Sequence, residues 1–227
     1  NAMKAVDNTI ELVGSGSSYY EPSNKWFDWN RKVLEGIGDK ITYLSIHRYW
    51  EGGPPDSFYN YMGNGARDFD EKIRLVADQI RAAKVRMNFK NNIYLSVDEW
   101  GTFSRNFTGV LPIAMCLNSF LRHADVVKMA NFTIATSLLS SDLTKGTFKS
   151  PLFYTFKLFS NNCLGSSVDT YVASDTFGTA QFKGIKYLDV TTVYSKKDNV
   201  VFINVINRSE DKKITTSIIS NSGDFSG

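Results

Sequence analysis

The sequence contains little that would suit a metal site, a disulfide framework or a membrane span. Only two of its 227 residues are cysteines, Cys116 and Cys163, and they lie far apart with no CxxC or Cys/His spacing. We expect both to be ordinary buried thiols. No segment approaches eighteen consecutive apolar residues, so no membrane-spanning helix is predicted.

A strong excess of one charge is also absent. The chain has 26 basic and 23 acidic residues, a net charge of +3, and both signs are scattered along it. A nucleic-acid-binding surface usually shows as a cluster of lysine and arginine, so the sequence does not indicate a nucleic-acid partner. With 42% hydrophobic residues, the chain can bury a core in one domain, or in one domain plus a small second one.

Strand-like and helix-like segments alternate up to about residue 165. Short runs rich in β-formers predict the strands, and apolar residues at helical spacing predict the helices between them. The predicted strands are 10–13, 41–47, 93–97 and 126–132. The predicted helices are 25–36, 68–87, 111–123 and 151–159, the last with a proline in its first turn. This alternation is typical of β-α units with parallel strands.

The pattern changes after about residue 166. Short predicted strands then follow one another, with turn signals but no helix-length pattern between them. They are 168–172, 180–182, 187–194, 200–207 and 213–219. We therefore expect an α/β domain over residues 1–165 and an antiparallel, partly formed β-sandwich over residues 166–227.

Two architectures fit the β-α units: an open doubly wound sheet and a section of a (β/α)8 barrel. A dinucleotide-binding open sheet needs a glycine-rich turn that leads directly into a helix. The candidate turn, Gly14 to Ser18, lacks the third glycine and opens no immediate helix, which disfavours phosphate binding. In a barrel, the reacting groups lie at the carboxyl ends of the strands.

Polar and aromatic residues gather at those predicted strand ends, and Asp98-Glu99-Trp100 is the most informative group. Adjacent side chains of a strand point to opposite sides, so one carboxylate is free to face the barrel mouth while hydrogen bonds hold the other in the wall. Retaining glycoside hydrolysis needs an ionised carboxylate below the anomeric carbon and a protonated carboxyl group about 5 Å away. The alternative is a pair of structural salt bridges, but the position at a strand end before a tryptophan favours the catalytic interpretation.

Four further residues are candidates to line a sugar site: His47, Tyr49, Trp50 and Phe103. Histidine and tyrosine can hold a nucleophile in position, and aromatic rings stack on the apolar face of a sugar. Packing in the core is the alternative role for Trp50 and Phe103. The other histidine, His123, lies at a predicted helix end, where a structural role is favoured.

Several segments, taken in order, resemble the α-L-arabinofuranosidases of glycoside hydrolase family 51. They are Thr9–Val13 with Gly16–Ser18, Tyr43–Tyr49, Leu95–Trp100, Leu121–Lys128, Pro151–Tyr154 and Tyr187–Asp189. The resemblance implies a partial (β/α)8 TIM barrel of about four C-terminal β-α units, followed by an antiparallel β-sandwich segment. It also implies a retaining hydrolase that removes arabinofuranosyl groups from arabinose-containing plant polysaccharides or oligosaccharides, with no cofactor and no metal.

The resemblance assigns roles to single residues. Glu99 takes the position of the family nucleophile, Tyr49 that of a tyrosine that hydrogen-bonds the nucleophile, and His47 that of its neighbour on the same strand. Phe103 stands where the family often has a tryptophan that lines the sugar site. Ile134 stands where characterised members have a glutamine that reaches the sugar, which leaves the sugar specificity open.

The proton donor of the family has no counterpart in this sequence. It is a glutamate in a Gly-Asn-Glu segment at the end of barrel strand four, and that tripeptide occurs nowhere in the 227 residues. The resemblance therefore implies that the chain supplies strands five to eight and the nucleophile, without the acid/base glutamate. Loss of such an acid costs roughly 10²–10⁴-fold in rate, so we expect little or no activity from the chain alone. Glu21, Glu51 and Asp142 lie in predicted loops and are weaker candidates for the acid.

A half-barrel exposes two strand edges and the apolar flank of its interior. We therefore expect self-association, or pairing with the missing half of the barrel. Two other functions stay open at this point. One is a related hydrolase of the same clan with another sugar specificity, and the other is a non-catalytic sugar-binding or assembly protein.

Overall fold

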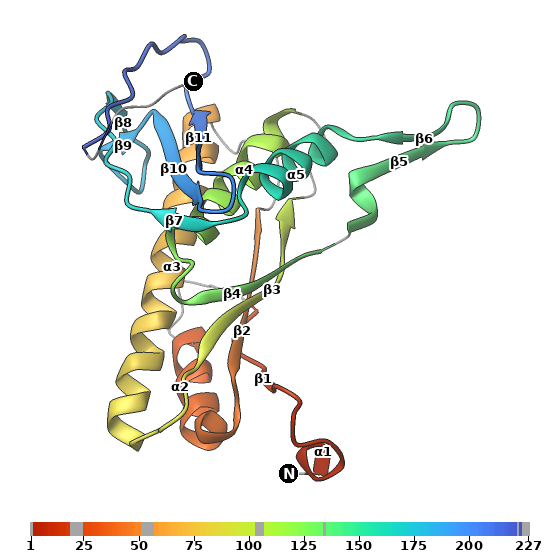
Figure 1. Cartoon of the computed structure of the whole chain (residues 1–227), viewed down its shortest axis with the longest axis vertical. Coiled ribbons are helices and arrows are strands. Elements are labelled where there is room, and N and C mark those ends of the chain that lie inside the picture. Colours follow the sequence, from red (N-terminus) through yellow and green to blue (C-terminus); the bar gives the residue numbers. More distant parts are fainter. Residues whose placement is uncertain are drawn as a thin grey trace.

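The computed structural model describes residues 2–18, 25–50, 57–102, 107–133, 135–221 and 223, with the backbone alone at residues 50, 66, 107, 108, 135 and 136. Figure 1 shows a parallel sheet flanked by helices, with a smaller antiparallel sheet near the C-terminus and a hairpin that projects from the body. The first helix, α1 (Ala2–Val6), lies near the N-terminus, at the opposite end of the molecule from the C-terminus.

The parallel sheet consists of β1 (Val13–Gly14), β2 (Tyr43–Trp50), β3 (Tyr94–Thr102) and β4 (Val127–Phe132), in the order β1-β2-β3-β4. All three neighbouring pairs are parallel. The expected β-α units with parallel strands are thus confirmed. β2 and β3 continue past their predicted ends, and these extra residues are the ones that carry the candidate site.

Four longer helices cover the sheet: α2 (Lys25–Ile37), α3 (Phe58–Met87), α4 (Phe107–Arg122) and α5 (Pro151–Asn162). Short 3₁₀ helices follow α2 (Gly38–Lys40) and β4 (Ala135–Leu138). The core between sheet and helices consists of side chains that are no more than 1% exposed, including Leu34, Leu44, Ile46, Phe69, Ile73, Leu95, Val97 and Trp100. Apolar residues at helical spacing face apolar strands, which is the arrangement that buries both.

Helix α3 begins ten residues before the start predicted from its apolar spacing. Ser57 caps it by accepting a hydrogen bond from the Asn60 amide at 3.2 Å, and Asn88 ends it in the left-handed conformation (φ 56°). The missed first turns contain Gly63, which weakens a helical pattern. A Cβ at Gly63 would lie 2.6 Å from Ile185 Cδ1, so the close approach of another segment explains the glycine inside the helix.

The C-terminal region is antiparallel, as expected. β7 (Ser166–Val168), β10 (Leu188–Ser195) and β11 (Val200–Asn207) form a sheet in the order β11-β10-β7, and β8 (Thr176–Phe177) pairs with β9 (Ile185–Lys186). Of the strand predicted at 168–172, only Val168 lies in a strand, at the end of β7, and two other predicted strands are wrong. Residues 180–182 form a turn in which the Thr179 hydroxyl accepts hydrogen bonds from the Gln181 and Phe182 amides, and residues 213–219 form no strand.

A hairpin of β5 (Leu139–Asp142) and β6 (Gly146–Lys149) was missed by the sequence pattern, and it projects from the end of the sheet in Figure 1. Asp142 closes its turn by accepting hydrogen bonds from Thr144 and from the Lys145 amide. These hydrogen bonds, from Thr144 above all, lower the pKa of Asp142. A carboxyl group held ionised in this way is poorly suited to donate a proton, so the structure gives no support to Asp142 as the acid.

A cluster of charges joins the helices to the antiparallel sheet. Arg122 on α4 binds Asp70 on α3 at 3.2 Å and Asp189 on β10 at 2.6 Å. His123 Nε2 and the Ser119 hydroxyl also contact Asp70, at 3.2 and 2.5 Å. His123 therefore has the structural role that the sequence favoured.

The pKa of Asp70 reflects this cluster. Burial by itself would raise it, but the His123 hydrogen bond, the Arg122 charge and the Ser119 hydrogen bond outweigh burial and hold it well below its usual range. A lowered carboxyl pKa stabilises the fold above the unfolded-state pKa of about 4, and that contribution is lost as the pH falls towards the folded-state value.

Both cysteines are free thiols, and burial raises the pKa of Cys116 and of Cys163. Within the described part of the chain, no helix is long and apolar enough to cross a membrane.

We predict that Asp70→Asn lowers the free energy of unfolding by about 2 kcal/mol at pH 7, because Arg122 and His123 lose a charged partner in a largely buried network. The difference from the unchanged chain should shrink as the pH falls below about 4, because the Asp70 carboxyl takes up a proton in the unfolded state while it stays ionised in the folded state. Urea unfolding at pH 7 and at pH 3 measures both values. Asp78→Asn, in an exposed pair with Arg81 on the same helix, is the matched control and should change stability by less than about 0.5 kcal/mol. Equal effects of the two substitutions would contradict the role of the cluster.

Candidate active site

The candidate site is built by β2 and β3, whose pairing shifts by one residue at its centre. Ile46 lies opposite Val97, but the next pair is His47 opposite Glu99. β3 therefore has one more residue than β2 at this point, Asp98, which is the mark of a β-bulge. Sequence alternation predicts that Asp98 and Glu99 point to opposite sides, but the bulge overrides it and brings both carboxylates against the His47 ring.

Asp98 is the carboxylate that hydrogen bonds hold in the wall. Its Oδ1 accepts a hydrogen bond from the Ser45 hydroxyl at 2.8 Å and lies 3.2 Å from His47 Nε2. Ser45 precedes His47 by two residues on β2, so both side chains leave the strand on the same side. This fixes the carboxylate against β2.

Glu99 is the more accessible carboxylate, with its side chain 49% exposed. The Tyr49 hydroxyl donates a hydrogen bond to Glu99 Oε2 at 2.9 Å, and His47 Nδ1 lies 3.5 Å from the same oxygen. Within the described residues, no hydrogen bond reaches the other oxygen, Oε1. Among the described residues, one oxygen is thus held by the protein while the other is left to meet a ligand.

The His47 ring stands between the two carboxylates. A neutral imidazole carries one N–H and can donate to only one of them, whereas the protonated ring can donate to both. The distances of 3.2 and 3.5 Å place the ring within reach of each. His47 therefore links the two carboxylates in space.

The Tyr49 phenol remains a hydrogen-bond donor at neutral pH. Burial raises its pKa, a side-chain hydrogen bond with Thr133 lowers it, and the hydrogen bond and charge of Glu99 raise it again. The result is a pKa above the ordinary tyrosine value. A neutral phenol beside an ionised carboxylate holds that carboxylate by a charge-assisted hydrogen bond.

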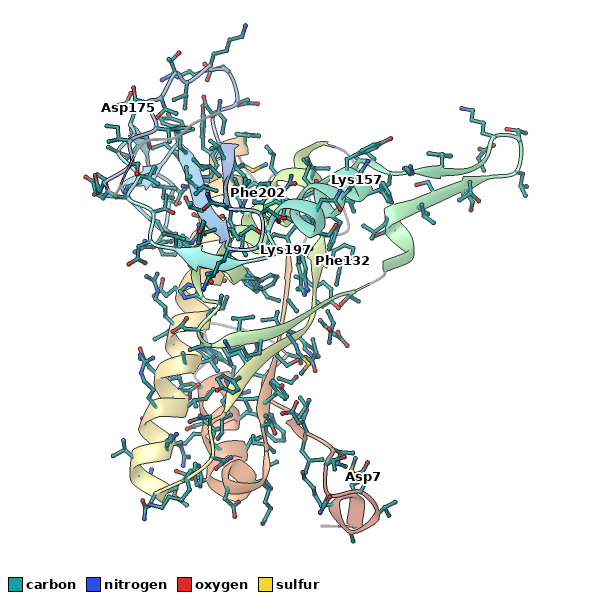
Figure 2. The ribbon with its side chains drawn as sticks, viewed as in Figure 1. Asp7, Phe132, Lys157, Asp175, Lys197 and Phe202 are labelled. Atoms are coloured by element: carbon teal, nitrogen blue, oxygen red, sulfur yellow. The ribbon has the colours of Figure 1, made fainter. Side chains whose placement is uncertain are left out.

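The structure gives only part of the predicted aromatic lining. Trp50 ends β2, paired with Thr102, but its side chain lies outside the described residues, as do Phe103 and Ile134. Glu21 and Glu51, the other weak candidates for the acid, also lie outside them. Trp100 belongs to the core, 1% exposed against the rings of Phe120, Phe132 and Phe156. Phe132 is labelled in Figure 2 at the end of β4.

Two residues of the site were missed by sequence reasoning. Ser45 had a usable signal, since it lies two residues before His47 on the same predicted strand. Thr133 had none, because it follows the last strand of the sheet and reaches the site only through the folded structure.

A cavity of about 520 Å³ lies elsewhere, between α3, the α4–β4 connection and β7, with Arg74, Arg122 and Asp169 among its lining residues. None of the predicted site residues lines it, so it is separate from the carboxylates. Among the described residues, no group of His, Cys, Asp and Glu side chains is placed to hold a metal ion.

With this geometry in place, comparison with known proteins identifies the family. The sequence profile of the α-L-arabinofuranosidase C-terminal domain matches residues 98–224, more than half of the chain. The chain belongs to the α-L-arabinofuranosidase family. The match begins at Asp98, so the two carboxylates fall inside it.

Curated relatives are similar over nearly the whole chain. An intracellular exo-α-(1→5)-L-arabinofuranosidase of Bacillus subtilis (strain 168) is 29% identical over 94% of this chain and 47% of the relative. An exo-α-(1→6)-L-arabinofuranosidase of Bifidobacterium longum is 26% identical over 91% of this chain and 45% of the relative. The chain spans about half the length of the curated arabinofuranosidases it matches.

Solved structures of arabinofuranosidases share the fold. A family 51 α-L-arabinofuranosidase from Bifidobacterium longum has a TM-score of 0.82 at 19% identity, over 92% of this chain and 47% of that one. The arabinose complex of the Thermotoga maritima enzyme has a TM-score of 0.70 at 22% identity, over 91% and 45%. The α/β fold with one parallel sheet and antiparallel sheets is that of the corresponding region in these proteins.

We predict that Glu99→Gln lowers the pKa of Tyr49, because the neighbouring negative charge that disfavours the phenolate is removed. Burial remains, so the pKa should stay above the ordinary tyrosine value. Fluorinated tyrosine titrates at a lower pH, and its ¹⁹F NMR signals follow Tyr49 while the chain stays folded. Glu71→Gln, an exposed change on α3, should leave the Tyr49 titration where it is. A Tyr49 pKa unmoved by Glu99→Gln would show that the two groups are not in contact in solution.

Proposed function

We propose that the chain is the nucleophile-bearing part of a retaining α-L-arabinofuranosidase, with Glu99 as the nucleophile. The observation that carries the proposal is the state of the Glu99 carboxylate. Tyr49 holds one of its oxygens, the other has no hydrogen bond within the described residues, and the side chain is half-exposed at the ends of two parallel strands. The family membership and the names of the relatives support the substrate class.

In this proposal the free oxygen of Glu99 attacks the anomeric carbon of an arabinofuranosyl group. The bond from that carbon to the leaving oxygen breaks, the leaving oxygen takes up a proton, and a glycosyl ester forms on Glu99. Water then attacks the same carbon and gives one proton to the group that protonated the leaving oxygen, which releases arabinose with the original configuration and Glu99 as carboxylate. Tyr49 holds Oε2 throughout, with His47 beside the same oxygen, so that the attacking oxygen is presented in one orientation.

The proton for the leaving oxygen comes, in this proposal, from a glutamate outside these 227 residues. Asp98 is an unsuitable donor because Ser45 and His47 both hold it as an acceptor. The proposal that the chain is part of a larger hydrolase also includes its fold. The parallel sheet of residues 1–165 forms half of a (β/α)8 barrel, residues 166–227 form part of a β-sandwich, and the free edges of β1 and β4 pair with the other barrel half. His47, Tyr49, Trp50 and Phe103 line the sugar site.

The sugar and linkage that the chain acts on have several candidates, each with its own test. The relatives carry names for both (1→5) and (1→6) linkages, and Ile134 stands where the resemblance expects a glutamine that reaches the sugar. A hydrolase of the same clan with another specificity would prefer the 4-nitrophenyl xyloside or galactofuranoside to the α-L-arabinofuranoside. A non-catalytic sugar-binding protein would bind arabino-oligosaccharides without turnover, and Glu99→Gln would not change that binding.

The nucleophile is tested by azide rescue of Glu99→Gly in the protein expressed from the complete gene. With 4-nitrophenyl α-L-arabinofuranoside we expect the substitution to lower kcat by about 10⁴-fold or more. Azide should restore turnover, because it fits the space left by the side chain. It attacks the anomeric carbon, 4-nitrophenolate leaves with the bonding electrons, and the product is the β-arabinofuranosyl azide with inverted configuration.

Asp98→Gly is the matched control, since it removes the neighbouring carboxylate by the same substitution. It should lower activity through the loss of a partner for His47, and azide should not restore it. Rescue of Asp98→Gly with inversion, or full activity of Glu99→Gly without azide, would overturn the assignment of Glu99.

A further inference from the structure

Asp98 alone has no opposite residue within the paired length of β2 and β3. Val97 lies opposite Ile46 and Glu99 lies opposite His47, so the ladder does not fix the residue between them. The Asp98 side chain has to supply that constraint. Whatever holds its carboxylate therefore also decides how the strand turns towards Glu99.

The side chain that holds Asp98 is that of Ser45. The Ser45 hydroxyl donates a hydrogen bond to Asp98 Oδ1 at 2.8 Å, and Ser45 is only 5% exposed. A carboxylate can only accept, so the direction of this hydrogen bond is fixed. His47, two residues further along β2, has its Nε2 atom 3.2 Å from the same oxygen. Ser45 thus ties the bulged residue of β3 to the strand that carries His47 and Tyr49.

Ser45 is in turn fixed by the segment that follows β1. A Cβ at Gly16 would lie 2.0 Å from the Ser45 carbonyl oxygen, and this close approach allows only glycine. One residue later, the Ser17 carbonyl accepts a hydrogen bond from the His47 amide at 3.2 Å. The backbone of β2 is therefore held by β3 on one edge and by this segment on the other. The Ser45 hydroxyl is a fixed point against which Asp98 is placed.

We propose that Ser45 is a positioning residue, which holds Asp98 and through it the bulge that turns Glu99 towards Tyr49. The alternative is that Ser45 stabilises the sheet and has no effect on where Glu99 lies. The inference rests on the proposed role of Glu99 for its effect on catalysis, but the orientation of Glu99 is testable without any turnover.

The sheet itself offers a matched control at Ser96. Ser96 lies directly opposite Ser45 on β3 and is 1% exposed, but its hydroxyl has no hydrogen-bond partner within the described residues. Serine to alanine thus removes the same atom at two buried, neighbouring positions, and only one of the two changes breaks the contact with Asp98. Removal of a hydroxyl that makes no hydrogen bond costs little.

The orientation of Glu99 is tested in the 227-residue chain by the Tyr49 titration, followed by ¹⁹F NMR. The hydrogen bond and charge of Glu99 raise the Tyr49 pKa, so a Glu99 that turns away should let this pKa fall towards the ordinary tyrosine value. We expect that fall in Ser45→Ala and no change in Ser96→Ala. An unchanged Tyr49 pKa in Ser45→Ala, or an equal fall in both variants, would overturn the proposal.

The effect on catalysis is tested in the protein expressed from the complete gene. Ser45→Ala should lower kcat by about three- to tenfold, the value of one hydrogen bond, with a smaller change in KM. Ser96→Ala should leave both constants within about twofold. In an Asp98→Ala background, Ser45→Ala should have no further effect. An equal loss of kcat with and without Asp98 would mean that Ser45 acts on the sheet alone, and would contradict the positioning role.

The two proposals fail in different ways. If Glu99→Gly retains full activity, the proposed function is wrong, but the Tyr49 titration still shows whether Ser45 sets the orientation of Glu99. If Glu99→Gly behaves as a nucleophile variant and neither the titration nor kcat responds to Ser45→Ala, only the inference about Ser45 is wrong.

Discussion

The extra residue in β3 at Asp98 is the constraint on which the rest of the site depends. In a regular ladder, His47 would face one carboxylate of the Asp98-Glu99 pair and the other would point away. The shift from Ile46–Val97 to His47–Glu99 places both carboxylates against one imidazole. Bulges re-aim side chains in this way next to active sites. Here the result is one carboxylate fixed by Ser45 and one left half-exposed.

The fold supplies the rigidity that such a bulge needs. Trp100, two residues beyond Asp98, is 1% exposed and packs edge-on against Phe120 and Phe132. It anchors the strand from the helix side while the carboxylates emerge on the sheet's other face. Further away, Arg122 links α3, α4 and β10 through two carboxylates. The helices that back the site are thus tied to the antiparallel sheet by charge as well as by apolar packing.

Much of this architecture follows from the sequence because it depends on local patterns. The β-formers of 41–47 and 93–97, with apolar helical spacing between them, are enough to predict parallel strands with a connecting helix. The first turns of α3 could not be predicted in this way, because Gly63 is there for its contact with Ile185 rather than for helix propensity. The strand predicted at 180–182 failed for a related reason, since the Thr179 hydroxyl offered the backbone a turn instead.

The residues of the site also fall into those that the sequence predicts and those that depend on the folded structure. Glu99, Tyr49 and His47 could be named from their positions on strand ends and from the family resemblance, and the structure brings these three together. The bulge could not be foreseen, because nothing local in Val97-Asp98-Glu99 requires an extra residue there. Thr133 could not be predicted for the same reason, since its hydrogen bonds with Trp100 form only in the folded sheet.

The central claim, that Glu99 attacks the sugar, is tested most directly by trapping the covalent intermediate. An arabinofuranosyl donor with fluorine at C2 and a good leaving group forms the glycosyl ester faster than water can remove it. After reaction with the protein expressed from the complete gene, proteolysis and mass spectrometry locate the added sugar. The account predicts one sugar per chain, attached to Glu99. A sugar attached to Asp98 or to any other carboxylate, in a protein that turns over arabinofuranosides, would contradict it.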